Sequence, residues 1–404
     1  YVGEQALAAV GTPTPIMNIA ILLISGMCMG ASVLMSSQYG AKDYDTLSRQ
    51  ISTTMLAGCG FSVVFSLLML LLANPVLRLI RVPETAIPEA AAYLRIIFMG
   101  LIFTFMYNFL ANTMRALGDS KTPLYFLVTS AFLNIFGDLF FVVVLRWGVA
   151  GSAIATVCSE GLCCLLCGIY IKKKIPLLCL GKKWWVFDKS LLGKTVSYGS
   201  TSAMQQVCLQ LGKLIIQSVV NTQGVAVMAA FTAVNRVDDF AYTPQQNIGH
   251  AMTTFLAQNK GAGHKERMKQ GFQTGLLIEL VYSIGLFCVI WGLAPQIMTL
   301  FAEDGDAQVV SLGISYLHLI SWMYILPGLT NGVQGFFRGI GDLKVTLYST
   351  FMNMFGRVVA VFVMIRLLQM EFASLAWANM VGWIVMLLFE VPLLVKSMRN
   401  GECG

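Results

Sequence analysis

Charged residues are scarce in this sequence. Only 12% of its 404 residues are charged and the mean hydropathy is +0.72, whereas soluble domains carry about 25% charged residues. So few charges leave too little polar surface to coat a water-soluble globule, which excludes a soluble domain. The apolar runs are continuous and long enough for membrane-spanning helices, whereas a transmembrane β-barrel would alternate apolar and polar residues. The composition therefore predicts an all-α polytopic membrane protein.

The sequence also lacks the motifs of enzymes and of ATP-driven pumps. It contains no Walker A loop, no HExxH helix and no GxSxG elbow. Its three histidines, His250, His264 and His318, are far apart in the chain. We therefore predict neither an enzyme nor a bound cofactor.

Ten cysteines are present, but they do not form a recognisable metal-binding or disulfide pattern. Most lie inside apolar runs, and the cluster of Cys163, Cys164 and Cys167 has no histidine beside it. We interpret them as small apolar residues that pack within helices, and predict no metal centre built from them.

Helical spans can be placed from the apolar runs and the breaks between them. Pro75 and Pro244 are expected to end or interrupt helices. Tyr1 to Gly11 is interpreted as the end of a further helix, so we expect twelve spans in the intact protein. The eleven other spans are expected at 14–38, 50–73, 90–114, 122–145, 149–171, 195–220, 226–257, 272–300, 309–335, 344–368 and 373–396.

The chain is a duplicated unit. An R-x-x-G-D turn occurs at Arg115 and again at Arg338, and an N-x-F-G sequence follows each, at Asn134 and Asn353. Each copy holds six spans, an even number, so both copies enter the membrane in the same orientation, as in transporters built from parallel repeats. We predict an N-terminal bundle at 1–171, a linker at 172–190 and a C-terminal bundle at 191–404.

Basic residues gather in alternate connections between the spans, most densely in the linker 172–190. The positive-inside rule places these connections, and with them the linker and both termini, in the cytoplasm. The net charge of +7 therefore indicates membrane orientation, and we predict no nucleic-acid partner.

Asp138 is the most informative residue, because it is an acid inside an otherwise apolar span. A carboxylate at mid-membrane costs about 3 kcal/mol on insertion scales, and Asn134 lies one helical turn earlier on the same face. Two interpretations stay open, a site that binds a cation or a polar cluster that only ties helices together. Further candidates for a polar pocket around Asp138, from the neighbouring spans, are Asn108, Asn112, Thr156 and Glu160.

The second copy carries Arg357 where the first has Asp138, so the two halves cannot share one kind of proton site. Three glutamines form a polar stripe on one face of the seventh span. Such a stripe indicates that this face lines a water-filled vestibule rather than packing against another helix. Candidate residues of a substrate cavity are therefore Asn112, Glu160, Gln205, Gln206, Gln210 and Arg357.

Several of these motifs together resemble the multidrug and toxic compound extrusion (MATE) family. They are the two R-x-x-G-D turns, the QYGA and QNKGA ends of the second and eighth spans, N-x-x-x-D in the fifth span and GVAGSAIAT in the sixth. The resemblance covers the whole chain and is closest to the DinF-like bacterial branch. It implies two six-helix bundles in a V shape and a monomer in the bacterial inner membrane.

The resemblance also implies a function, antiport of amphipathic, often cationic drugs by alternating access, coupled to protons or sodium ions. In prokaryotic members a polar pocket of the N-terminal bundle takes the coupling ion. Asn108, Asn134, Asp138 and Thr156 fall on positions of that pocket, and a sodium ion near Asp138 would be the one metal expected. A second acid of the pocket lies on the first helix, in a part that precedes Tyr1.

A lipid-linked oligosaccharide flippase of the same superfamily is the alternative. Such a protein shares the architecture but needs a basic cavity for pyrophosphate. Lys213, Arg236 and Arg357 keep this alternative open, and it depends on which of them face the cavity.

Overall fold

A computed structural model describes residues 14–79, 86–175, 185–301, 307–367 and 374–399, together with Val82, Glu84 and Phe372. The expected remnant of a first helix and residues 176–184 of the linker 172–190 lie outside these residues. The chain divides into two compact units, Tyr1–Ala203 and Met204–Gly404. Helices make up both units, and the described part of the chain contains no strand.

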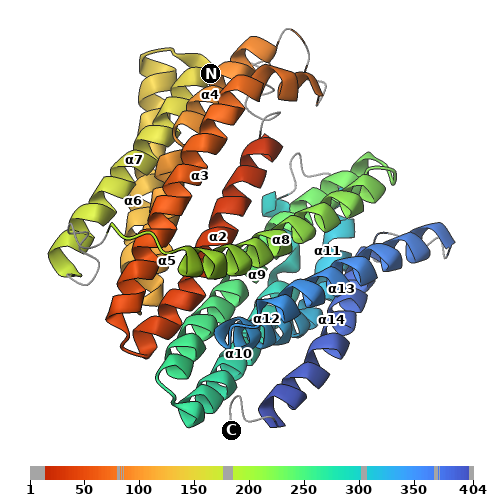
Figure 1. Ribbon diagram of the computed structural model, residues 1–404. Helices are drawn as coiled ribbons and strands as arrows, with labels where there is room; N and C mark the ends of the chain where they lie inside the picture. Colours follow the sequence, from red (N-terminus) through yellow and green to blue (C-terminus); the bar gives the residue numbers. More distant parts are fainter. Residues whose placement is uncertain are drawn as a thin grey trace. The chain divides into compact units, whose positions relative to one another are not determined.

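The first unit contains six of the predicted spans or parts of them (Figure 1). Its helices are α2 (Thr14–Gly40), α3 (Tyr44–Leu79), α4 (Ile87–Met99), α5 (Leu101–Ala116), α6 (Lys121–Asp138), which continues as the π-helix η1 (Leu139–Val144), and α7 (Gly148–Lys174). The first half of α8 (Lys189–Val220) also belongs to this unit, because Gln50 of α3 donates a hydrogen bond to Thr195 Oγ1 at 2.5 Å.

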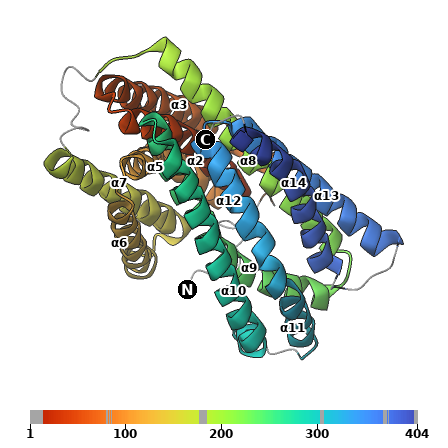
Figure 2. The same cartoon turned by 90° about the horizontal axis from the view of Figure 1, so that it is seen from below.

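The second unit contains the rest of α8 and the helices that follow it. In Figures 1 and 2, α13 and α14 run side by side, and their residues are in contact. The helices are α9 (Val225–Gly261), α10 (Lys265–Phe301), α11 (Ala307–Ser321), the 3-10 turn η5 (Trp322–Tyr324), α12 (Ile325–Gly339), α13 (Leu343–Phe362), the π-helix η6 (Val363–Leu367) and α14 (Ser374–Arg399).

All eleven predicted spans are confirmed as helices, with boundaries that differ by several residues. Eight helical stretches in the described residues are long and apolar enough to cross a membrane, and α4 with α5 forms a ninth, bent by 42°. Helices α8 and α9 fall outside this apolar set although they have 32 and 37 residues. Their polar residues, described below, lower their hydropathy.

The two proline breaks predicted from the sequence are wrong. Pro75 lies inside α3, which continues to Leu79, and Pro244 lies inside α9. Membrane helices tolerate proline because ending the helix would leave several backbone groups without partners in lipid, which costs more than the one hydrogen bond that proline removes.

Helix α6 presents a polar face to its own unit. Its opposite face is exposed and apolar, as Phe132, Ile135 and Phe136 show. A Cβ atom on Gly137 would lie 3.0 Å from Cβ of Ala155 on α7, so α6 and α7 pack closely. Asn134, one turn before Asp138, contacts α7 through a hydrogen bond to Thr156.

In the second unit, glycines bring α12 against α9. A Cβ atom on Gly335 would lie 2.7 Å from the carbonyl oxygen of Gly249, and one on Gly339 would lie 2.6 Å from Cβ of Leu256. Cβ atoms do not approach other heavy atoms so closely, so these positions require glycine. The close approach carries the polar end of α12 into the interior of the unit.

We predict that Gly335→Ala destabilises the protein by about 1–3 kcal/mol, because the added methyl group meets the backbone of α9. Thermal unfolding in detergent measures this as a lower Tm. Gly285→Ala is the matched control, since a Cβ atom there meets no heavy atom within 4 Å and alanine favours the helix. Equal Tm values for the two variants would contradict the packing of α12 on α9.

Candidate functional site

The acid singled out by the sequence lies at the end of α6, with its amide neighbour one turn before it. Asp138 and Asn134 are both partly buried on the face toward α7. The Nδ2 atom of Asn134 donates to Thr156 Oγ1 at 3.2 Å, and Thr156 in turn donates to the carbonyl of Ser152 at 3.1 Å. The structure therefore brings Asn134 and Thr156 together, and it places Asp138 on the same helix face.

The carboxylate of Asp138 is not neutralised within the part of the chain that the structure describes. Its Oδ1 atom is buried without a hydrogen-bond partner, and no described basic group lies within 4.0 Å of it. A buried carboxylate oxygen without a hydrogen-bond partner is a candidate ligand for a cation.

A second acid lies in the same unit, on α7. Glu160 accepts a hydrogen bond from Thr104 of α5, and the Nδ2 atom of Asn108 donates to the carbonyl of Thr104 at 2.9 Å. Asn112 donates to the carbonyl of Asn108 at 2.8 Å. Both amides therefore bond to the backbone of their own helix, and Thr104 is the residue whose described side-chain hydrogen bond reaches Glu160.

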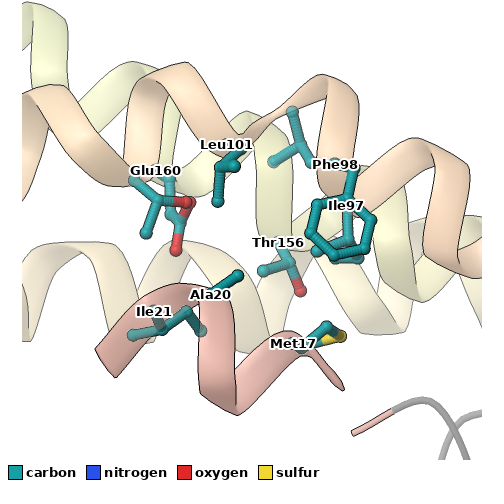
Figure 3. A pocket seen from close by; sticks show the side chains of 10 residues that line it. Met17, Ala20, Ile21, Ile97, Phe98, Leu101, Thr156 and Glu160 are labelled. Atoms are coloured by element: carbon teal, nitrogen blue, oxygen red, sulfur yellow. The ribbon is translucent and has the colours of Figure 1, made fainter. Parts of the chain in front are cut away.

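Thr156 and Glu160 line a small cavity of about 30 Å³ beside α2 (Figure 3). Figure 3 shows them as polar side chains among the apolar side chains of α2, α4 and α5. The volume suits a single water molecule or ion. Thr104 also lines this cavity, and the sequence analysis missed it, although it lies one turn before Asn108 on the same face.

A larger cavity, about 520 Å³, lies within the second unit. Five helices line it, α8, α9, α12, α13 and α14. Four residues proposed from the sequence for a substrate cavity, Gln205, Gln206, Gln210 and Arg357, are among its lining residues. The other two, Asn112 and Glu160, belong to the first unit.

A hydrogen-bond network organises one wall of this larger cavity. Oε1 of Gln334 accepts from Gln205 at 3.2 Å and from Arg338 at 2.6 Å. Gln205 and Gln334 also donate to Thr350 Oγ1, at 2.9 and 3.1 Å. The shared acceptor fixes the position of the Arg338 guanidinium, which lines the cavity.

Arg338 was not predicted as a cavity residue, because it belongs to a repeated turn motif. Its equivalent Arg115 is exposed, whereas Arg338 is only 7% exposed. The second copy has glycines at Gly332, Gly335 and Gly339 where the first has larger residues. These glycines let α12 pack against α9 and are the sequence signal that could have identified Arg338.

Two acids of this region have described partners. Lys213 Nζ lies 3.5 Å from Asp239 Oδ1, with both side chains more than half exposed, so the pair contributes little stability. Asp238 is buried and accepts a hydrogen bond from the hydroxyl of Tyr324.

Comparison with known proteins identifies relatives over most of the chain. The MatE family model matches residues 1–140 and 202–364. The probable multidrug resistance protein YpnP of Bacillus subtilis (strain 168) is 31% identical over 348 residues, which cover 85% of this chain and 77% of the relative. The probable multidrug resistance protein YoeA of the same strain is 29% identical over 364 residues, which cover 88% and 77%.

A solved structure shows the same fold. It is the outward-facing conformation of a multidrug resistance MATE family transporter of the MOP superfamily. It matches with a TM-score of 0.89 and 21% identity, and the match covers 98% of this chain and 88% of the other. The all-helical membrane fold predicted from the composition is thereby confirmed.

We predict that Gln334→Leu lowers stability by about 1–3 kcal/mol, because it removes the acceptor shared by Gln205 and Arg338 and leaves a buried guanidinium without that partner. The Tm in detergent checks this. Gln206→Leu serves as the control, since Gln206 lines the same cavity without a described hydrogen bond. An equal loss of stability in both variants would contradict the proposed role of the network.

Proposed function

Because this chain belongs to the MATE family of membrane transporters, we propose that it is a cation-coupled antiporter that exports amphipathic compounds, organic cations among them. The family consists of transporters and not of enzymes, in agreement with the missing catalytic motifs. The names of YpnP and YoeA as probable multidrug resistance proteins support an export function. We place the chain in the DinF-like branch, as a monomer of the bacterial inner membrane.

The observation that carries the proposal is the partnerless Oδ1 atom of Asp138 in a membrane-spanning helix. Asn134 lies one turn earlier on the same helix face and donates to Thr156, so the amide and hydroxyl oxygens of these two residues are further candidate ligands. Carboxylate, amide and hydroxyl oxygens are hard ligands that suit a sodium ion, and the carboxylate alone suits a proton. We include Asn108 in the proposed site on the basis of the family resemblance, since its described hydrogen bond goes to the backbone carbonyl of Thr104.

Coupling requires that the cation and the exported compound bind unequally to the two conformations of the transporter. A ligand shifts a conformational equilibrium only through its differential affinity for the two states. Protonation or sodium binding at Asp138 removes an unpaired buried charge, which changes the packing that α6 favours against α7. The compound then binds with different affinity before and after this change.

The flippase remains the second candidate, and one observation favours it. Lys213, Arg338 and Arg357 line the cavity of the second unit, as a pyrophosphate site would need, although Arg236 is not among its lining residues. Transport of a lipid-linked oligosaccharide by reconstituted protein without any cation gradient would favour the flippase over the antiporter.

We predict that Asp138→Asn in the full-length protein abolishes efflux driven by a proton or sodium gradient, because the amide keeps the size of the side chain but cannot titrate or neutralise a cation. Drug accumulation in cells under separate gradients measures this. Asp45→Asn, an exposed acid in the first turn of α3, is the control and should pump at the wild-type rate. Wild-type efflux by Asp138→Asn would show that Asp138 is structural.

We further predict that the linker 172–190 is cytoplasmic, as its lysines indicate. In a cysteine-free background, a cysteine at Lys189 should resist a membrane-impermeant thiol reagent added to intact cells. A cysteine at Glu84, which is exposed in an opposite connection, should react under the same conditions. Rapid labelling at Lys189 and none at Glu84 would reverse the proposed orientation.

A further inference from the structure

The cavity of the second unit has an unusual charge for a site that would take organic cations. Its lining residues include three cationic side chains, Lys213, Arg338 and Arg357, but a single carboxylate, Asp239. His250 lines it too. Asp239 is already paired with Lys213 at 3.5 Å, which leaves the two guanidinium groups to set the polarity of the cavity.

Arg338 is held at the cavity wall without a direct ion pair to any described carboxylate. Its side chain is 7% exposed, its Nη2 atom donates to the neutral Gln334, and its Nε atom has no described partner. A guanidinium whose described hydrogen bond goes to a neutral amide keeps N–H donors that an oxyanion can use.

Arg357 is the second such group. Its Nε atom is buried without a described partner, and the side chain is partly exposed to the cavity. Asn353 lies one turn earlier on α13 and lines the same cavity. A Cβ atom on Gly382 of α14 would lie 3.1 Å from Cβ of Arg357, so the close approach of α14 fixes the stem of the arginine.

Two other acids of this unit interact electrostatically with the arginines, Glu390 with Arg338 and Asp238 with Arg357, but neither forms a direct ion pair with them. Asp238 accepts from Tyr324, while Glu279 and Glu390 are fully buried and are not among the residues that line the cavity. Among the described residues, no carboxylate lies within 4.0 Å of either guanidinium.

We propose that this cavity binds the anionic group of an amphipathic substrate, a carboxylate, sulfonate or phosphate, through Arg338 and Arg357. The inference rests on the proposed export function and assigns amphipathic anions and zwitterions, rather than organic cations, as its preferred substrates. Guanidinium groups bind such oxyanions through pairs of parallel N–H donors. The apolar part of the substrate packs against the apolar and aromatic lining residues, Leu209, Tyr242, Met354, Trp383 and Met386.

The test compares two dyes that share a xanthene ring system but differ in charge, carboxyfluorescein (an anion) and rhodamine 123 (a cation). Fluorescence anisotropy measures their binding to the purified full-length protein in detergent, at constant pH and without any gradient. We expect carboxyfluorescein to bind more tightly than rhodamine 123. Arg357→Gln should weaken carboxyfluorescein binding about tenfold or more, the effect of losing one charge-assisted contact, without weakening rhodamine 123 binding.

Two further variants separate charge from structure. Arg357→Lys keeps the charge and should retain most of the affinity for carboxyfluorescein that Arg357→Gln loses. Arg267→Gln makes the same charge change at an exposed position of α10 outside the cavity and should leave both affinities unchanged. Arg338→Gln should weaken carboxyfluorescein binding as Arg357→Gln does. If Arg338→Gln fails to fold, the affinities of Arg357→Gln for the two dyes are sufficient to test the inference.

Tighter binding of rhodamine 123 than of carboxyfluorescein by the wild type would overturn the inference. So would binding of neither dye, or an equal loss of affinity for both dyes in Arg357→Gln. Because these measurements use no ion gradient, they are independent of Asp138. If the wild type binds carboxyfluorescein as expected and the variant Asp138→Asn still exports drug, the proposed coupling through Asp138 is refuted. The inferred polarity of the cavity then still stands.

Discussion

Every polar side chain inside a membrane-spanning helix needs a partner, because lipid offers none and an unpaired group costs several kcal/mol. Most polar groups of this protein obey the constraint locally. Asn108, Asn112 and Thr113 bond to backbone carbonyls one turn earlier in their own helix. Several buried charged groups do not, among them Asp138 in the first unit and Arg338, Arg357, Glu279 and Glu390 in the second. Of these, we propose ligands for Asp138 and for the two arginines.

The same constraint explains which helices look least like membrane spans. Helices α8 and α9 fall outside the set of strongly apolar spans, and both line the larger cavity, α8 with its glutamines and Lys213 and α9 with Asp239 and His250. A helix that faces a polar cavity can carry residues that a lipid-facing helix cannot. Low hydropathy in this protein therefore marks the walls of the cavity.

Much of this arrangement could be predicted from the sequence. An acid in an apolar span identified Asp138, and helical periodicity placed Asn134 beside it and aligned the glutamines of α8. Periodicity is local, however, and it could not show that Asn112 bonds to its own backbone or that Pro75 and Pro244 stay inside helices. It also could not show that glycines in α12 draw Arg338 inside while Arg115 stays at the surface, since that difference arises from contacts between helices far apart in sequence.

The central claim is that cation binding at Asp138 and substrate binding are linked. Linkage requires the affinity for the substrate to change when the occupancy of the cation site changes. The most direct measurement is the Kd of a transported dye for the purified full-length protein as a function of pH and of sodium concentration, in the wild type and in Asp138→Asn. The account predicts a Kd that varies with pH or sodium in the wild type and is constant in the variant. The same dependence in both proteins would contradict it.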